Sequence, residues 1–298
     1  MSLSTGVPAP RTGMVVIDKE PGWTSHDVVA RVRRIFGQRR VGHAGTLDPD
    51  ATGVLLVGLG RATRLLRFLS ALSKTYTAEV VLGVATHTLD ASGEVVGTWD
   101  MGSVTLEDAR AAAAVLTGDI LQVPPMVSAV KMDGQPLYRL ARRGEEVPRV
   151  PRPVTVHRFE VAEGSEPGVL SIEVECSSGT YVRVLAADLG AALGGGAHLR
   201  NLRRTRVGSF TDAEARPVGL LDETSVLTPA QAMRDLDRAA ADPEVARLVG
   251  RGLPLDRVAV GATGDGPFAV VDDRGRLLAV YEATATDRIR PLVVLADR

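Results

Sequence analysis

The sequence is poor in cysteine, aromatic residues and long apolar runs, and each shortage excludes a class of protein or site. The single cysteine, Cys176, excludes an internal disulfide bond and most cysteine-based metal sites. Aromatic residues make up only 4% of the 298 residues, so we expect an aliphatic core. No apolar run approaches the roughly 20 residues that span a bilayer, and the N-terminus lacks the apolar segment of a signal peptide. These absences predict a cytoplasmic protein that does not bind membranes, with residues 1–12 disordered.

Lysine is also scarce, because only Lys19, Lys74 and Lys131 accompany 32 arginines. Where a cation merely solvates the surface, this sequence uses arginine. Each remaining lysine is therefore expected at a position that needs a compact ammonium group on a flexible stem. All three lie next to a predicted turn or at the start of a predicted strand.

The net charge of −1 gives no sign of nucleic-acid binding, but the charges are unevenly distributed. Residues 31–67 hold eight arginines and two aspartates, residues 196–206 hold four arginines and no acid, and residues 139–152 hold five arginines. Residues 211–245 instead carry eight acidic and three basic side chains. A solvated helix face explains any one cluster, whereas three clusters together predict a basic face for a phosphate backbone.

Predicted helices and strands follow one another without a steady strand–helix–strand alternation. Helices are predicted at 24–37, 62–72, 105–118 and from about 180, and strands at 14–18, 54–59, 73–86, 154–162, 168–176 and 199–210. A strand, a turn and an arginine-rich helix are predicted over 127–144. This mixture predicts an α+β fold with a mixed sheet for residues 1–240. Residues 241–298 read as short strands and turns and predict a second, small β-rich domain.

Residues 42–53, GHAGTLDPDATG, concentrate glycine and acid between apolar segments and admit three interpretations. Asp48 and Asp50 match the first positions of a calcium-binding EF-hand loop, but the twelfth position is Leu59 instead of glutamate. A phosphate-binding loop requires GxxxxGK[ST], which is absent. The third interpretation is a catalytic carboxylate, and it favours Asp48, because Pro49 forces the preceding residue into an extended conformation. The glycines are then expected to make room for a bulky substrate.

A carboxylate nucleophile in a partly dry pocket needs a fixed cation to remain ionised. Arg183, in SGTYVR, follows a glycine turn at the start of a predicted helix and is the candidate. Tyr76 and Tyr181 are two of only four tyrosines, and each begins a regular element beside a polar turn. Their placement suits stacking on an extruded base, although ordinary strand packing explains Tyr76 equally well.

These residues lie in motifs that resemble a known family. GHAGTLDPDATGVL closely resembles the catalytic motif GxxGTLDPxAxGVL of the TruB family, the pseudouridine synthases that modify uridine 55 in the TΨC loop of tRNA. Further segments resemble successive motifs of that family in order: DKEPGWTSHDVV, KTYTAEVVLG, THTLDASG, QVPPMVSAVKMDGQPLYRLARRGEEVPR, CSSGTYVRVLAADLG and GAHLRNLRRTRVGSF. The resemblance implies the pseudouridine synthase fold, with a mixed, largely antiparallel sheet flanked by helices and loops. It also implies a PUA-like RNA-binding domain over 241–298.

The resemblance also implies roles for individual residues. Asp48 is the expected nucleophile, Arg183 its partner, and Tyr76 the residue that stacks on the flipped base and assists proton removal from C5. The other expected substrate contacts are His43, Tyr181, Leu202, Asp90, Lys19 and Lys131. For the two lysines, contacts to the RNA backbone and purely structural contacts are both open. Where the family usually has TDT, this sequence has THT, so His87 replaces an acid and its role is open.

The implied reaction breaks the N1–C1′ bond of uridine, rotates the uracil and joins C5 to C1′. It requires no cofactor and no metal. Whether Asp48 attacks C6 of the base or C1′ of the sugar stays open. The expected substrate is the T-arm of tRNA, and a monomer without an obligate protein partner is expected.

Three alternatives remain. They are a guide-RNA-dependent synthase subunit, a non-catalytic module that binds or folds tRNA, and a carboxylate-dependent glycosidase. The last is disfavoured because no second catalytic carboxylate is evident.

Overall fold

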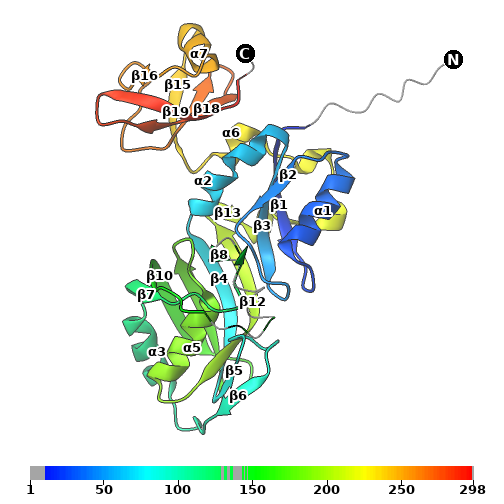
Figure 1. Ribbon diagram of the computed structural model, residues 1–298, viewed down its shortest axis with the longest axis vertical. Helices are drawn as coiled ribbons and strands as arrows, with labels where there is room; N and C mark the ends of the chain where they lie inside the picture. The colour runs from blue at the N-terminus through cyan, green and yellow to red at the C-terminus, as the bar shows by residue number, and fades with distance from the viewer. Residues whose placement is uncertain are drawn as a thin grey trace, which may run out of the picture.

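The computed structural model describes residues 11–128, 131–132, 135–136, 143, 145 and 147–296. It contains an elongated body built on a large sheet and a small β-rich domain at one end of that body (Figure 1). Most of the segment predicted as an arginine-rich helix, and most of the predicted disordered lead-in, lie outside the described residues.

The large sheet has ten strands in the order β14-β1-β3-β12-β4-β11-β10-β7, with β2 paired to β3 and β13 paired to β12. Among the described strand pairs of this sheet, only β1–β14 and β3–β12 are parallel, so the predicted mixed sheet is confirmed. The strands are β1 (Gly13–Lys19), β2 (Val41–Ala44), β3 (Thr52–Leu59), β4 (Lys74–Leu82), β7 (Gly118–Gln122), β10 (Arg152–Glu163), β11 (Val169–Cys176), β12 (Ala197–Val207), β13 (Phe210–Thr211) and β14 (Arg216–Pro217). Two short hairpins stand apart, β5 (Val84–Thr86) with β6 (Val95–Thr98) and β8 (Lys131–Met132) with β9 (Gln135–Pro136).

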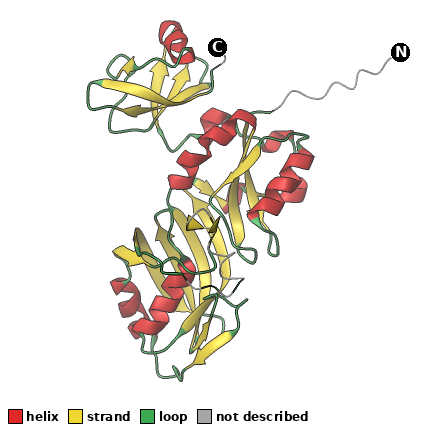
Figure 2. Cartoon of the chain, viewed as in Figure 1, coloured by secondary structure: helices red, strands yellow, loops and turns green. Residues whose placement is uncertain are grey.

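Helices lie against the sheet in two groups (Figure 2). The body contains α1 (Ser25–Ile35), η1 (Gly60–Leu65), α2 (Leu66–Ala71), α3 (Leu106–Val115), α5 (Val182–Ala192), η2 (Asp212–Glu214), η3 (Val218–Leu220), η4 (Glu223–Ser225) and α6 (Pro229–Ala232). The predicted helix 62–72 is in fact a 3₁₀ helix followed by a short α-helix, and the chain enters it at Gly60 with a positive φ of 58°. Thr24 and Thr105 each begin a helix through a reciprocal capping box, with Asp27 and Asp108 respectively.

The alternation of β1 shows how the sheet divides the core. Val15 and Ile17 pack on the α1 side, whereas Met14 and Val16 pack on the α2 side. A third cluster joins β4, β10 and β11 to α3 and α5. Tyr76 and Leu202 contact both this third cluster and the α1 cluster. The two residues therefore mark the junction between the helical groups.

The small domain is a five-stranded sheet in the order β15-β17-β18-β19-β16, covered by α7 (Pro243–Gly250). Its strands are β15 (Asp237–Ala241), β16 (Leu255–Asp256), β17 (Phe268–Asp272), β18 (Leu277–Ala283) and β19 (Arg288–Val294). β15 crosses the predicted boundary at 240/241, because its alanine-rich sequence gives little strand signal. The cluster on the α2 side continues into this domain, since Phe68 and Leu69 share it with Leu277, Val280 and Val293. No helix in the described part of the chain is long and apolar enough to cross a membrane.

Candidate active site

Residues 45–51, between β2 and β3, contain Asp48 and Asp50 and are called the acidic loop. Lys19 bonds to this loop from the interior of the protein. The Lys19 side chain is buried, and its Nζ donates to the carbonyl oxygens of Glu20 (3.0 Å), Pro49 (2.8 Å) and Ala51 (2.6 Å). Burial lowers the pKa of the Lys19 ammonium to about 8. Of the two roles left open for Lys19, the structure supports the structural one and corrects its assignment as a substrate contact.

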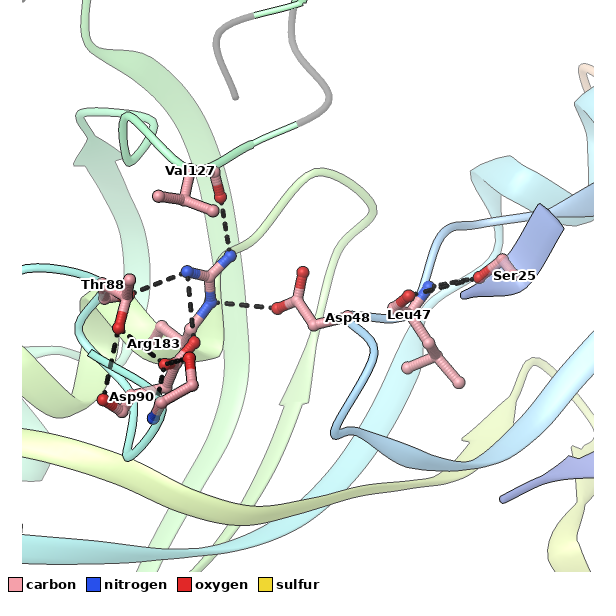
Figure 3. Close-up of polar contacts among 8 residues, drawn as sticks. Ser25, Leu47, Asp48, Thr88, Asp90, Val127 and Arg183 are labelled. Carbon is pink, nitrogen blue, oxygen red and sulfur yellow. Dashed lines mark hydrogen bonds and ion pairs between the residues drawn. The ribbon is translucent and has the colours of Figure 1, made fainter. Parts of the chain in front are cut away.

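The residue before Asp48 is fixed from the other side of the loop. The Ser25 hydroxyl donates to the Leu47 carbonyl (3.2 Å) and accepts from the Leu47 amide (3.0 Å), as Figure 3 shows. Gly22 N donates to the Pro49 carbonyl at 3.0 Å. With both neighbours of Asp48 bonded to fixed elements, its backbone position is determined by the fold before any substrate binds.

Arg183 supplies the predicted cation. Its Nε lies 2.9 Å from Asp48 Oδ2, and its Nη1 lies 3.4 Å from Asp90 Oδ2. Two carbonyl groups complete its coordination, Thr88 at 2.8 Å and Val127 at 2.8 Å (Figure 3). Only 5% of its side chain is exposed. The guanidinium therefore presents Nε to Asp48 in a single orientation, and the predicted ion pair is confirmed.

The Asp48 carboxylate is crowded by protein yet open to a pocket, since 43% of its side chain is exposed. Burial raises the pKa of Asp48 above its ordinary value, the Arg183 guanidinium opposes that rise, and the nearby Asp90 carboxylate adds to it. This combination suits a nucleophile, because the carboxylate is reachable from the pocket and the Arg183 guanidinium favours its ionised form.

The pocket above Asp48 has a volume of about 380 Å³ and is lined by Tyr76, Tyr181 and Leu202 as well as Arg183. Four of the predicted site residues therefore surround the predicted nucleophile, although they come from β4, β12 and the start of α5. Burial raises the pKa of the Tyr76 phenol, so this hydroxyl remains neutral at physiological pH. The volume is that of a site for one small ligand.

Arg204 also lines the pocket, although its sequence context does not single it out. It is buried, its Nε donates to the Val54 carbonyl at 2.7 Å, and its Nη2 donates to the Gly45 carbonyl at 3.2 Å. Its guanidinium reduces the rise in the Tyr76 pKa. Arg204 thus fixes one end of the acidic loop and places a positive charge under the pocket.

The loop glycines also serve Arg204. Gly53 has a φ of 97°, and a Cβ there would lie 2.2 Å from the Arg204 carbonyl oxygen. Gly45 has a φ of 78° and would place a Cβ 3.4 Å from Arg204 Nη1. The prediction that these glycines make room for substrate is corrected for Gly53, which makes room for β12. Gly45 does line the pocket.

Other predicted contacts lie outside the pocket wall. Asp90 accepts from the Thr88 hydroxyl (2.7 Å) and the Ser92 hydroxyl (2.6 Å). Its predicted role as a substrate contact is therefore corrected, because Asp90 is a second carboxylate that contacts Arg183. The His43 ring packs edge-on against His26 at 5.4 Å and is not among the residues that line the pocket.

Two positions that the sequence left open have different outcomes. His87, the replaced acid, is exposed, and its Nδ1 accepts from the Glu94 amide at 2.9 Å, which closes the turn. The side chain of Lys131 lies outside the described part of the structure.

The arginines of β12 were predicted to face a phosphate backbone, and the structure corrects this. Arg200 pairs with Glu79 (2.8 Å) and Glu166 (2.7 Å). Arg203 pairs with Asp18 at 2.9 Å. These acids lie in strands and loops far from β12 in the sequence. A segment whose only charged residues are arginines is therefore neutralised when the sheet assembles. Across the described residues, no group of three or more His, Cys, Asp or Glu side chains is arranged to hold a metal ion.

Comparison with known sequences agrees with this geometry. The profile of the N-terminal domain of TruB family pseudouridylate synthases matches residues 33–182, which include Asp48 and Tyr76. The chain belongs to the TruB family. The profile of the tRNA pseudouridylate synthase B C-terminal domain matches residues 183–239, so most of the five-stranded domain lies beyond both matches.

Curated members of the TruB family resemble the chain over nearly its whole length. The protein named tRNA pseudouridine synthase B from Arthrobacter sp. (strain FB24) is 47% identical, over 96% of this chain and 97% of the relative. The protein of the same name from Nocardia farcinica is 48% identical, over 97% and 95% respectively.

Solved structures give the same fold at lower identity. A Cbf5-Nop10-Gar1 complex contains a chain with a TM-score of 0.75 and 27% identity, matched over 96% of this chain and 85% of that one. A second match is an H/ACA RNP bound to a substrate RNA containing 2′-deoxyuridine, with a TM-score of 0.73 and 25% identity, over 96% and 86%.

Proposed function

We propose that the protein converts uridine 55 in the TΨC loop of tRNA to pseudouridine, with Asp48 as the nucleophile. The single observation that carries this proposal is the 2.9 Å ion pair between Asp48 and Arg183 at the base of a nucleotide-sized pocket. Asp48 lies in the segment that matches the family, and relatives 44–48% identical are named tRNA pseudouridine synthase B.

The residues around the pocket support each step of this isomerisation. The target nucleotide is extruded from the loop, which costs least where a base is already unpaired. Tyr76 and Leu202 offer flat and apolar surfaces to the extruded uracil. Asp48 then forms a covalent bond, at C6 of the base or C1′ of the sugar, as the N1–C1′ bond breaks. The uracil rotates and C5 bonds to C1′, and the bond between Asp48 and the substrate breaks, which returns Asp48 as a free carboxylate. The C5 proton leaves and N1 gains a proton, so the product is an isomer of the substrate.

The neutral state of Tyr76 restricts its role. Because burial raises the pKa of its phenol, Tyr76 is not a ready-made anionic base. It suits stacking on the uracil and hydrogen bonding while the C5 proton departs.

Tritium release provides the decisive experiment, because the C5 hydrogen is lost only when the reaction proceeds. Asp48→Asn should abolish release from tRNA that contains 5-tritiated uridine and leave tRNA binding within about twofold. Its folding should not suffer, because burial already disfavours the charged carboxylate. Asp50→Asn is the matched control, because Asp50 is exposed on the far side of Pro49. This variant should release tritium normally. Normal turnover by Asp48→Asn would contradict the mechanism.

A guide-RNA-dependent activity is the competing proposal, because the structural matches include H/ACA assemblies. The purified protein should form pseudouridine at position 55 of an unmodified tRNA transcript without any other component. We also propose that it acts as a cytoplasmic monomer and that the five-stranded domain is a PUA-like RNA-binding module. Light scattering of the purified protein tests the monomer.

A further inference from the structure

A cleft between the two domains is lined by arginine. It has a volume of about 1,590 Å³ and shares no lining residue with the active-site pocket. Its arginines come from η1, β15, α7 and the turn between β17 and β18: Arg61, Arg238, Arg247, Arg251, Arg274 and Arg276. We call this the interdomain cleft. Among the described residues that line it, none is acidic.

Most of these arginines have no acidic partner among the described residues. Arg276 pairs with Asp272 at 2.7 Å, and Arg61 donates to the Ala296 carbonyl at 3.1 Å. The guanidinium groups of the other four make no hydrogen bond or ion pair with any described residue. Those four are Arg238, Arg247, Arg251 and Arg274. An uncompensated group of like charges is unfavourable in a folded protein and is relieved by an anionic ligand.

The cleft is held in a fixed place by the core that joins the domains. Its wall contains Leu277 and Leu295, which belong to the same buried cluster as Leu65 and Phe68 of the body. The arginines are thus presented at a defined position relative to the sheet. Figure 1 shows α7, β15 and β18, which carry or adjoin these arginines, at the end of the molecule opposite the β5–β6 hairpin.

We propose that the interdomain cleft binds the phosphate backbone of tRNA at a part of the molecule outside the T-arm. This rests on the proposed function, which supplies a polyanionic substrate. Guanidinium groups bind phosphate through paired N–H donors, and exposed arginines from three elements can follow several phosphates in succession. The cleft is also larger than the roughly 1,000 Å³ upper range of ordinary small-molecule sites.

The experiment compares two substrates with the same target uridine, a full-length tRNA transcript and an isolated T-arm hairpin. Arg247→Gln/Arg251→Gln removes two charges from one face of α7. This variant should bind full-length tRNA about tenfold more weakly, and the slope of log K against log salt should fall by about 1.8. Binding and turnover of the hairpin should be unchanged. Arg290→Gln is the control, because it removes an exposed charge of the same domain outside the cleft.

The outcomes separate clearly. An equal loss on both substrates, or a loss in Arg290→Gln as large as in the double variant, would overturn the cleft as a separate binding surface. Unchanged binding of full-length tRNA by the double variant would overturn it in favour of an acidic protein partner. Failure of the wild-type protein to modify either substrate would count against the proposed function instead.

A different observation concerns Ser128, which lines the active-site pocket. The residue is buried, and its Oγ has no hydrogen-bond partner in the described structure. The adjacent Val127 carbonyl accepts from Arg183 Nη2 at 2.8 Å, so Ser128 is held beside the cation that orients Asp48. An unpaired buried hydroxyl is costly, and a ligand group that bonds to it removes this cost. We infer that the Ser128 hydroxyl bonds a polar group of the nucleotide bound in the pocket.

Stability and activity should move in opposite directions if Ser128 serves the ligand. Ser128→Ala should keep or raise the melting temperature of the free protein and lower kcat/KM about tenfold. The matched control is Ser177→Ala, because Ser177 lines the same pocket but its Oγ already accepts from Thr155 N at 2.9 Å. That control should lose stability. Wild-type kcat/KM in Ser128→Ala, or a fall in its stability, would overturn the inference.

Discussion

The arginines of β12 and those of the interdomain cleft have the same side chain and opposite surroundings. Every arginine of β12 bonds to the protein itself. Arg200 and Arg203 bond to acids, Arg204 bonds to backbone carbonyls, and Arg206 donates to the Thr75 hydroxyl. The guanidinium groups of four of the six arginines in the interdomain cleft bond to no described residue. The dense cluster in the sequence is therefore structural, and the dispersed arginines form the open basic surface. A cluster of arginines in a sequence predicts a binding face only when the acidic side chains that lie beside it in the folded protein are also known.

Arg183 gives the largest expected effect among the arginines that bond to the protein. Arg183→Gln removes the cation from Asp48 and should lower kcat for tRNA about 10²–10³-fold. Binding of tRNA should change little, because only 5% of the side chain is exposed. Single-turnover kinetics and filter binding measure the two quantities. Equal losses in binding and turnover would make Arg183 a phosphate ligand and would break the comparison.

Arg204 should contribute to stability more than to binding. Arg204→Met leaves the carbonyls of Val54 and Gly45 unpaired in the interior and should lower the free energy of unfolding by about 3 kcal/mol. Urea denaturation measures this loss. Arg206→Met is the control on the same strand, because Arg206 is 43% exposed and lies 4.0 Å from Glu175. A similar loss in both variants would show that general strand packing, and not the Arg204 bonds, is responsible.

The pH dependence of turnover sharpens the role of charge around Asp48. The reaction needs the carboxylate, and the folded protein raises its pKa, so kcat should fall tenfold per pH unit below a pKa higher than that of an ordinary aspartate. Arg183 lowers this pKa and Asp90 raises it. The acid limb should therefore move to higher pH in Arg183→Gln and to lower pH in Asp90→Asn. If the acid limbs of the two variants moved in the same direction, a group other than Asp48 would control the pH profile.

Arg203 should give the smallest effect. It is one-third exposed and its ion pair with Asp18 lies at the surface, so Arg203→Gln should cost less than about 1 kcal/mol of stability. The salt dependence of tRNA binding should not change. A decrease in the salt slope as large as that of the cleft variants would show that β12 also contacts phosphate, and the contrast between the two groups would fail.

The sequence was sufficient to predict the parts of the site that lie in contiguous motifs. Asp48 and Arg183 each lie in a distinctive motif, and the ion pair between them was predicted before any geometry. The scarcity of lysine was informative as well, because both Lys19 and Lys74 are buried with Nζ bonded to backbone carbonyls. The predicted roles of the remaining pocket residues stay predictions.

Features assembled from distant segments were not predictable. Arg204 bonds to residues 150 or more positions away, and nothing in LRRTRV distinguishes it from its neighbours. The interdomain cleft combines arginines from residues 61 to 276, and one of them, Arg238, lies in the acidic stretch 211–245. Spacing rules apply within one helix or strand, so they cannot reveal groups that only tertiary packing brings together.

The buried cluster that runs from Phe68 to Val293 limits how the small domain can be removed or exchanged. Removal of the five-stranded domain would expose Phe68 and Leu69 to water, so the body without it would be less stable and prone to aggregate. The two domains should melt in a single transition. The small domain is therefore not an appendage that can be exchanged freely between proteins, because any replacement must also complete the core of its neighbour.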